Sequence, residues 1–302
     1  MTATLTQFSD AGGVVMSPAV GESLDALDAA AVAEVFAEHG LILFRGFETS
    51  RAAFKTFSER LCGDFMTYQG GASVRRPVDG EPTVMTVSEP DHRFAIPLHG
   101  EMYYAKRRPG VLWFYCARPA DADGETTVAD AVALYDRLAP ATRAFFEGQP
   151  IRYVCTHPAG RWQALFHTDD VEAVRRFCAA EDTTVSVNEA DGSIVTNYVT
   201  WACADTHHGS RRAFINNILT MTWWEAHGVG NRIVRMADGS AIPEAIVGEL
   251  RAVEADVTRP VRWRPGDVLM VDNTRFMHGR RAFADAGREI YVRLSNHVGE
   301  KG

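Results

Sequence analysis

Short apolar runs separated by turn residues dominate the sequence from about residue 110 onward, and few helical segments lie between them. Strands are predicted at residues 111–116, 126–128, 151–156, 194–201, 257–263, 268–271 and 289–295. A doubly wound parallel sheet would require a helix after almost every strand, and this sequence lacks that alternation. We therefore expect a mostly β fold with decorating helices, built as an antiparallel barrel or a jelly roll.

Helices are predicted early in the chain and as insertions between the strands. The first covers residues 28–38, where Asp28 can cap the start and Gly40 suits the left-handed residue that ends a helix. The apolar run at 41–44 follows directly and predicts a buried strand. Further helices are predicted at residues 51–62, with Gly63 as the stop signal, directly after Asp130, and in a segment with Pro243 in its first turn.

The composition of the chain indicates one globular unit. Its 302 residues are 46% hydrophobic and 23% charged, values that exclude a largely disordered protein. Because no repeat or linker divides the sequence, we expect a single domain over residues 1–302, with lid or insert regions near 64–95 and 157–212. The first of these regions contains Met66, Tyr68, Arg75 and Arg76, and residues 201–212 form a second candidate loop.

Charge and cysteine content limit the partners. The formal net charge of −8 disfavours binding to nucleic acid or to an anionic membrane, so a small molecule is the expected partner. The five cysteines form no C-x-x-C pair, which argues against a disulfide framework and a structural zinc site. No signal peptide is visible in residues 1–21 and no apolar run is long enough to span a bilayer, so a cytoplasmic protein is expected.

Two segments could carry metal chemistry. In an extended chain, residues two apart point to the same side, so His99 and Glu101 would offer an imidazole and a carboxylate to one point. His278 follows the predicted strand at 268–271 and precedes Gly279, which permits close approach of backbone or ligand. Two histidines and one carboxylate form the facial arrangement of non-haem Fe(II) oxygenases, although a His–Glu pair at this spacing also arises by chance.

Two arginines near the C-terminus indicate an anion site. Arg288 and Arg293 flank or lie within the last predicted strand, which is mostly apolar. A guanidinium group in such a strand needs an anionic partner. A bound dicarboxylate would provide one, and a salt bridge to an acidic side chain of the protein would serve equally well.

These segments, taken in order, resemble the Fe(II)/2-oxoglutarate-dependent dioxygenases of the taurine dioxygenase group. The resemblance begins at HGLILFRG and covers most of the chain. It continues through LHGEMYY and FYCARPADADGETTVAD and ends with PGDVLMVDN, HGRRAF and GREIYVRLS. The glutamate in the first metal motif makes the chain look more like the clavaminate-synthase-like branch of this group.

The resemblance implies a double-stranded β-helix, a cupin-like jelly roll, and assigns roles to individual residues. The implied iron ligands and catalytic residues are His99, Glu101 and His278. The implied 2-oxoglutarate residues are Thr126, Arg288 and Arg293, with Arg288 favoured for the cosubstrate and Arg293 also facing the substrate. Tyr103 and Tyr104 follow the metal motif and either line the substrate pocket or belong to the core.

The implied reaction is hydroxylation of an unactivated C–H bond, with Fe(II), 2-oxoglutarate and O₂ consumed to release succinate and CO₂. The implied substrate is a free or carrier-tethered amino acid, or a natural-product intermediate, so a carrier protein is a candidate partner. Desaturation, ring closure and taurine-type catabolic oxidation remain alternatives within the family, whereas the carboxylate at Glu101 argues against halogenation. A zinc hydrolase and a non-catalytic binding module on the same fold are the alternatives outside it.

Overall fold

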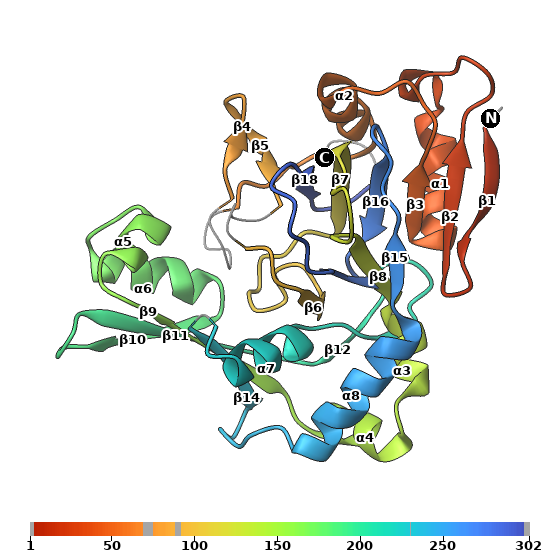
Figure 1. Cartoon of the computed structure of the whole chain (residues 1–302). Helices are drawn as coiled ribbons and strands as arrows, with labels where there is room; N and C mark the ends of the chain where they lie inside the picture. The colour runs from red at the N-terminus through yellow and green to blue at the C-terminus, as the bar shows by residue number, and fades with distance from the viewer. Residues whose placement is uncertain (1–2, 69–74, 88–91, 230, 299–302) are drawn as a thin grey trace.

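The computed structural model describes residues 3–68, 75–87, 92–229 and 231–298, and its centre is a pair of β-sheets (Figure 1). The larger sheet has the strand order β1-β2-β3-β16-β7-β18-β5-β4, and the smaller has the order β15-β8-β17-β6. Every strand pair in them is antiparallel except β2 and β3. The larger sheet contains β1 (Thr4–Ser9), β2 (Gly12–Ser17), β3 (Leu41–Phe44), β4 (Pro77–Val78), β5 (Glu81–Thr86), β7 (Val111–Arg118), β16 (Val268–Asp272) and β18 (Glu289–Ser295). The smaller sheet contains β6 (Ile96–His99), β8 (Thr126–Asp130), β15 (Arg259–Val261) and β17 (Phe276–Arg280).

Both faces of the larger sheet are covered, which explains why its central strands are apolar throughout. Alternate residues such as Leu43 and Phe114 pack between the two sheets. Their neighbours Phe44 and Trp113 point to the opposite face, against helices α1 (Ala29–His39) and α2 (Arg51–Leu61). The two facing sheets form the predicted jelly roll, and the double-stranded β-helix expectation is confirmed.

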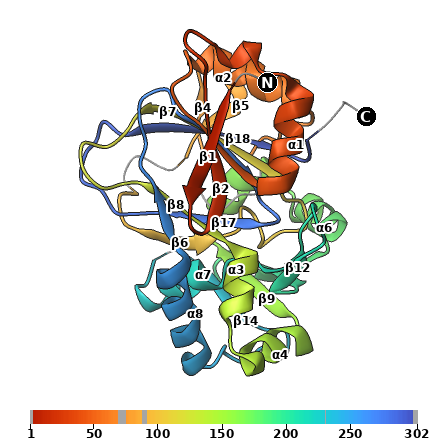
Figure 2. The same cartoon turned by 90° about the vertical axis from the view of Figure 1, so that its right-hand side faces the viewer.

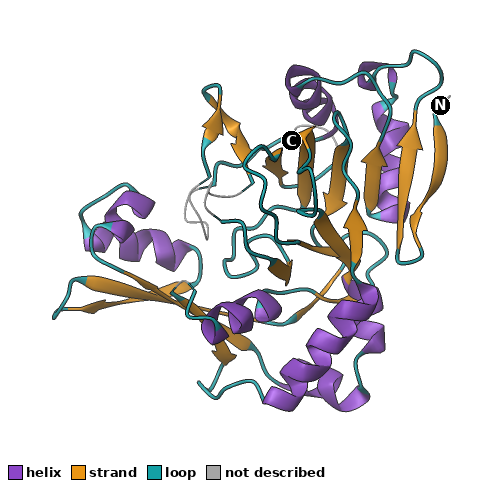
Figure 3. Cartoon of the chain, in the orientation of Figure 1, coloured by secondary structure: helices purple, strands orange, loops and turns teal. Residues whose placement is uncertain are grey.

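A second group of elements packs beside the smaller sheet. Figure 3 shows most of its helices at the periphery of the molecule, and Figure 2 shows α3, α4 and α8 at the end opposite α1 and α2. Its four-stranded sheet has the order β10-β11-β9-β14, and a short hairpin pairs β12 with β13. The strands are β9 (Ile151–His157), β10 (Thr183–Asn188), β11 (Ser193–Thr200), β12 (Cys203–Asp205), β13 (Arg212–Phe214) and β14 (Arg232–Met236). The helices are α3 (Ala131–Arg137), α4 (Pro140–Gly148), α5 (Arg161–Phe166), α6 (Val171–Ala180), α7 (Ile218–Ala226) and α8 (Glu244–Val257), and a 3-10 turn, η1 (Leu24–Ala26), precedes α1.

The predicted helix ends are observed where side chains cap them. Asp28 accepts a hydrogen bond from the backbone N–H of Ala31 at 2.8 Å, and Asp130 accepts one from Val132 at 2.9 Å. Gly40 ends α1 with a φ of 69°, as the sequence predicts. In the part of the chain that the structure describes, no helix is both long and apolar enough to cross a membrane.

Some predicted boundaries are wrong. The segment 257–263 is not one strand, because α8 continues to the buried Val257 and β15 covers only Arg259–Val261. Pro243 is the N-cap of α8 rather than a residue of its first turn. The region 64–95 contains the hairpin of β4 and β5, and residues 69–74 and 88–91 of it lie outside the described residues. That this region and 157–212 act as lids stays a prediction.

Candidate metal centre and active site

Strand pairing brings the two histidines together. His99 on β6 lies opposite His278 on β17, and the centroids of their rings are 4.3 Å apart. The strands approach closely at Gly279, where an added Cβ would lie 2.5 Å from the carbonyl oxygen of Ile96. A residue with a side chain at position 279 would therefore push the two histidine-bearing strands apart.

The chain turns sharply after β6 and presents Glu101 to the same point. Asn273, which is completely buried, holds this turn in two ways. Its Oδ1 accepts a hydrogen bond from the Glu101 backbone N–H at 2.8 Å, and its Nδ2 donates to the Glu101 carbonyl oxygen at 3.1 Å. Gly100 has no room for a side chain, since a Cβ there would lie 2.4 Å from the Tyr103 ring. Sequence reasoning gave Asn273 no role, although a buried amide at the end of an apolar strand signals a backbone contact.

His99, Glu101 and His278 present one ligand atom each within 4.8 Å of one another. Nε2 of His278 lies 3.4 Å from Oε2 of Glu101. Nδ1 of His99 lies 3.0 Å from the carbonyl oxygen of Pro97, so a proton on Nδ1 can be donated there and Nε2 keeps its lone pair for a metal. The structure thus assembles the whole predicted triad.

The charge states of the triad suit a divalent cation. Removal from water lowers the pKa of His99 to about 3, so this imidazole is neutral at physiological pH. Burial raises the pKa of Glu101, but the nearby Arg75 and His278 outweigh that effect and hold it below its usual range. Nδ1 of His278 is buried and has no hydrogen-bond partner among the described residues. Two imidazoles and one carboxylate on one side fit a metal with open positions, as in Fe(II) oxygenases.

A cavity of about 430 Å³, called the main cavity below, opens over the triad. Thr126 and Arg288 line it, and so does Arg280, which pairs with Thr126 across β17 and β8. Arg288 donates from Nε to the carbonyl oxygen of Gly124 at 2.8 Å, and Thr126 accepts from Nε1 of Trp263 at 3.0 Å. Burial lowers the pKa of Arg288 to about 10. The structure therefore places two of the three predicted 2-oxoglutarate residues beside the triad.

The prediction that Arg293 faces the site is wrong. Its side chain is 1% exposed and points to the other face of β18, toward α2. It donates to Oε1 of Glu59 at 2.8 Å and to Oγ of Ser58 at 2.6 Å. The reason is strand alternation, because Ile290, Val292 and Leu294 face the interior of the jelly roll and residue 293 must face away.

The two tyrosines after the metal motif separate. Tyr103 packs in the core, outside the described cavity lining, and its hydroxyl donates to the carbonyl oxygen of Asn273 at 3.0 Å, so its position matches the second of the two alternatives, a core residue. Tyr104 lines the main cavity, and its hydroxyl lies 3.1 Å from that of Tyr68.

Positive side chains line the main cavity in excess, which sequence reasoning missed. Five arginines and a single carboxylate, Glu101, belong to its described lining. The arginines are Arg75, Arg161, Arg232, Arg280 and Arg288. Arg75 bonds through Nη2 to Oε2 of Glu101 at 2.8 Å, a contact between residues that no local sequence pattern connects.

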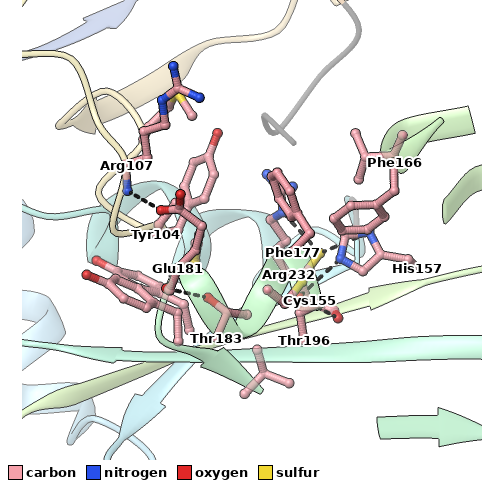
Figure 4. Close-up of a pocket in the computed structure, with 18 of the residues that line it drawn as sticks. Tyr104, Arg107, Cys155, His157, Phe166, Phe177, Glu181, Thr183, Thr196 and Arg232 are labelled. Carbon is pink, nitrogen blue, oxygen red and sulfur yellow. Dashed lines mark hydrogen bonds between the residues drawn. The ribbon is translucent and has the colours of Figure 1, made fainter. Parts of the chain in front are cut away.

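A second cavity of about 100 Å³ adjoins the main one and shares Tyr104, Met221 and Arg232 with it. In Figure 4, Cys155, His157 and Arg232 lie together, away from Arg107 and Glu181. Arg232 donates from Nε to Sγ of Cys155 at 3.1 Å and lies 4.6 Å from the centre of the Tyr104 ring. Tyr104 and Arg232 therefore form part of the wall between the two cavities.

The comparisons with known proteins cover nearly the whole chain. Residues 5–294 match the family described as taurine catabolism dioxygenase TauD, TfdA family. A clavaminate synthase-like protein of Arabidopsis thaliana is 28% identical over 272 residues, which cover 85% of this chain and 82% of that protein. The dapdiamide synthesis protein DdaC of Enterobacter agglomerans is 26% identical over 284 residues, covering 88% and 84%.

Solved structures share the fold. A taurine dioxygenase from Burkholderia xenovorans superposes with a TM-score of 0.63 at 16% identity, covering 99% of this chain and 90% of that one. PvcB from Pseudomonas aeruginosa gives a TM-score of 0.61 at 17% identity, with 98% and 92% covered. The family match and the shared fold confirm the resemblance seen in the sequence, and the chain belongs to the TauD, TfdA family of dioxygenases.

Proposed function

We propose that this dioxygenase uses Fe(II), 2-oxoglutarate and O₂ to hydroxylate an unactivated C–H bond of a small molecule, releasing succinate and CO₂. The observation that carries the proposal is the triad of His99, Glu101 and His278, whose ligand atoms lie within 4.8 Å of one another at one cavity. When bound there, Fe(II) would supply the activation of O₂ that no protein side chain can provide.

Arg288 and Thr126 support 2-oxoglutarate as the cosubstrate. Arg288 bonds to a backbone carbonyl oxygen, and no carboxylate of the described residues forms an ion pair with it. A partly buried guanidinium without an anion is unfavourable, and the distal carboxylate of 2-oxoglutarate would supply the missing partner. The Thr126 hydroxyl lines the same cavity and can donate to that carboxylate.

The protein's own task is to hold the reactants and exclude water. The main cavity of about 430 Å³ has room for 2-oxoglutarate and a small substrate together. Phe94, Phe114 and Trp224 belong to its lining and keep part of the wall apolar. Asn273 fixes the carboxylate-bearing turn, so the ligand geometry is set by hydrogen bonds as well as by the metal.

The proposed substrate is a free or carrier-tethered amino acid or a natural-product intermediate. This choice is supported by the relative whose name refers to dapdiamide synthesis. Desaturation, ring closure and taurine-type catabolic oxidation by the same centre are the alternatives, and the family description refers to taurine catabolism. A zinc hydrolase or a binding module would leave the partly buried Arg288 in the main cavity unexplained.

The test is anaerobic addition of Fe(II) and then 2-oxoglutarate, with detection of the weak visible charge-transfer band of a chelated keto acid. We expect the band in the wild type and its loss in Glu101→Ala and His278→Ala. His157→Ala is the matched control, because it removes a buried histidine of the second cavity and should keep the band. A folded, metal-loaded wild type without the band would favour the hydrolase or the binding module.

A further inference from the structure

We propose that Arg75 binds a carboxylate of the substrate and places the carbon beside it near the metal, an inference that rests on the proposed function. Arg75 lines the main cavity, and its side chain is 8% exposed. Nη2 bonds to Glu101, while Nε and Nη1 are buried without a hydrogen-bond partner among the described residues. Such donors are shielded from bulk solvent and have no protein acceptor in the described parts of the chain, which points to an acceptor that arrives with a ligand.

Metal binding increases the need for this acceptor. Oε2 of Glu101 is the atom that Arg75 contacts, and the same oxygen faces Nε2 of His278 at 3.4 Å. A metal held by the triad would compete with Arg75 for Glu101. The guanidinium would then retain less of Glu101, its one carboxylate partner among the described residues, and a substrate carboxylate could replace what is lost.

The surrounding rings hold the guanidinium in place. Cζ of Arg75 lies 4.0 Å from the centre of the Tyr68 ring, and the Tyr68 hydroxyl lies 3.1 Å from that of Tyr104. An arginine that is already oriented loses little rotamer freedom on binding. Since each N–H···O bond spans about 2.9 Å, a carboxylate held by Arg75 would lie next to the triad.

The charge of the cavity supports an acidic substrate. Its described lining contains five arginines and one carboxylate. In the proposed function, 2-oxoglutarate neutralises Arg288, which bonds to Gly124. Arg75 lies at a different position in the cavity, where it bonds to Glu101, so a second acid is needed to pair with it. A thioester-tethered acyl group has no carboxylate at its linkage, so Arg75 favours a free acid as the substrate.

Ligand-observed NMR tests this assignment on protein loaded with Zn(II) and 2-oxoglutarate. The probes are the free L-amino acids, the corresponding carboxamides, and taurine as a sulfonate. We expect at least one amino acid to bind and its carboxamide not to bind. Arg75→Gln should weaken that binding about ten- to hundredfold, since a hydrogen bond to a charged group contributes about 1.5–3 kcal/mol. The affinity of Arg75→Lys for the amino acid should lie between those of the wild type and Arg75→Gln.

Arg137→Gln is the matched control, because Arg137 is an exposed arginine that pairs with Asp256 and is not part of the described cavity lining. It should change binding less than about threefold, as expected for an exposed charge. Carboxamides that bind as well as the acids, acid binding that survives Arg75→Gln, no acid binding at all, or binding of taurine alone would overturn the assignment. The Fe(II)–2-oxoglutarate band of wild type and Arg75→Gln, measured in parallel, shows separately whether the proposed function stands.

Discussion

Separate alanine substitutions of two arginines five residues apart, Arg288 and Arg293, give the sharpest test of the site. Arg288 faces the main cavity, and Arg293 joins β18 to α2 through Glu59 and Ser58. Arg288→Ala removes about 2–3 kcal/mol of charge-assisted bonding to 2-oxoglutarate. The 2-oxoglutarate concentration for half-saturation should therefore rise about 30- to 150-fold, with little change in melting temperature.

Arg293→Ala should have the opposite effect, with a lower melting temperature and an unchanged 2-oxoglutarate requirement. The variant loses bonds to Ser58 and Glu59, and its side chain also lies 3.6 Å from the centre of the Phe65 ring. Because the Glu59 side chain is 40% exposed, solvent screens part of that ion pair, and we expect the free energy of unfolding to fall by about 3 kcal/mol. For a chain of this size, each kcal/mol lowers the melting temperature by about 2 °C or more. Melting should therefore fall by about 5–8 °C, with 2-oxoglutarate half-saturation unchanged.

Anaerobic titration of the charge-transfer band and thermal melting of both variants decide the question. Arg293→Met is a useful companion variant, because it keeps most of the buried volume and should melt closer to the wild type. If Arg293→Ala raised the 2-oxoglutarate requirement while melting normally, or Arg288→Ala left that requirement unchanged, the assignment from strand alternation would be refuted.

Three further perturbations address the metal centre and the fold. Asn273→Ala removes the side chain that holds the Glu101 turn and should lower metal affinity about tenfold or more, measured by competition with a chromogenic chelator. Unchanged affinity would contradict the role of Asn273 in positioning Glu101. Gly279→Ala should also weaken metal binding, because its Cβ would meet the Ile96 carbonyl oxygen at 2.5 Å, and normal affinity would show that the strands adjust. Burial lowers the pKa of His157 from 6.5 to about 4. Below pH 6.5 this histidine is therefore protonated in the unfolded state but still neutral in the folded state, so the free energy of unfolding should decline as the pH falls. Between pH 6.5 and about pH 5, this histidine should lower the free energy of unfolding by about 1.5 kcal/mol. In denaturant melts, the stability of His157→Gln should therefore depend less steeply on pH than that of the wild type.

The central strands were predictable because their side chains follow simple rules. β3 and β16 are apolar on both faces since helices cover one face and the smaller sheet covers the other. The start of α1 was predictable from Asp28, and its end from Gly40. The triad was predictable as a set because the resemblance supplied the pairing between segments far apart in the chain.

The remaining features depend on contacts that no local pattern encodes. Nothing near Arg75 in the sequence indicates that it reaches Glu101, because the contact is made by a long connection whose path the fold determines. The position of Arg293 is different, since the alternation of Ile290, Val292 and Leu294 was present in the sequence and would have corrected the prediction. Val257 was misassigned because an apolar residue at the end of a helix and one at the start of a strand have the same local pattern.

The hydrogen bonds of Asn273 have a consequence for metal selectivity. They join the segment before His278 to the turn that carries Glu101, so the ligands are arranged by the protein even before an ion arrives. A prearranged set of two imidazoles and one carboxylate binds first-row cations in the Irving–Williams order, in which Fe²⁺ ranks below Co²⁺, Ni²⁺ and Cu²⁺. Under the proposed function, loading with iron therefore depends on which metals are available where the protein folds, and Ni²⁺ from a purification resin would compete with iron for the triad.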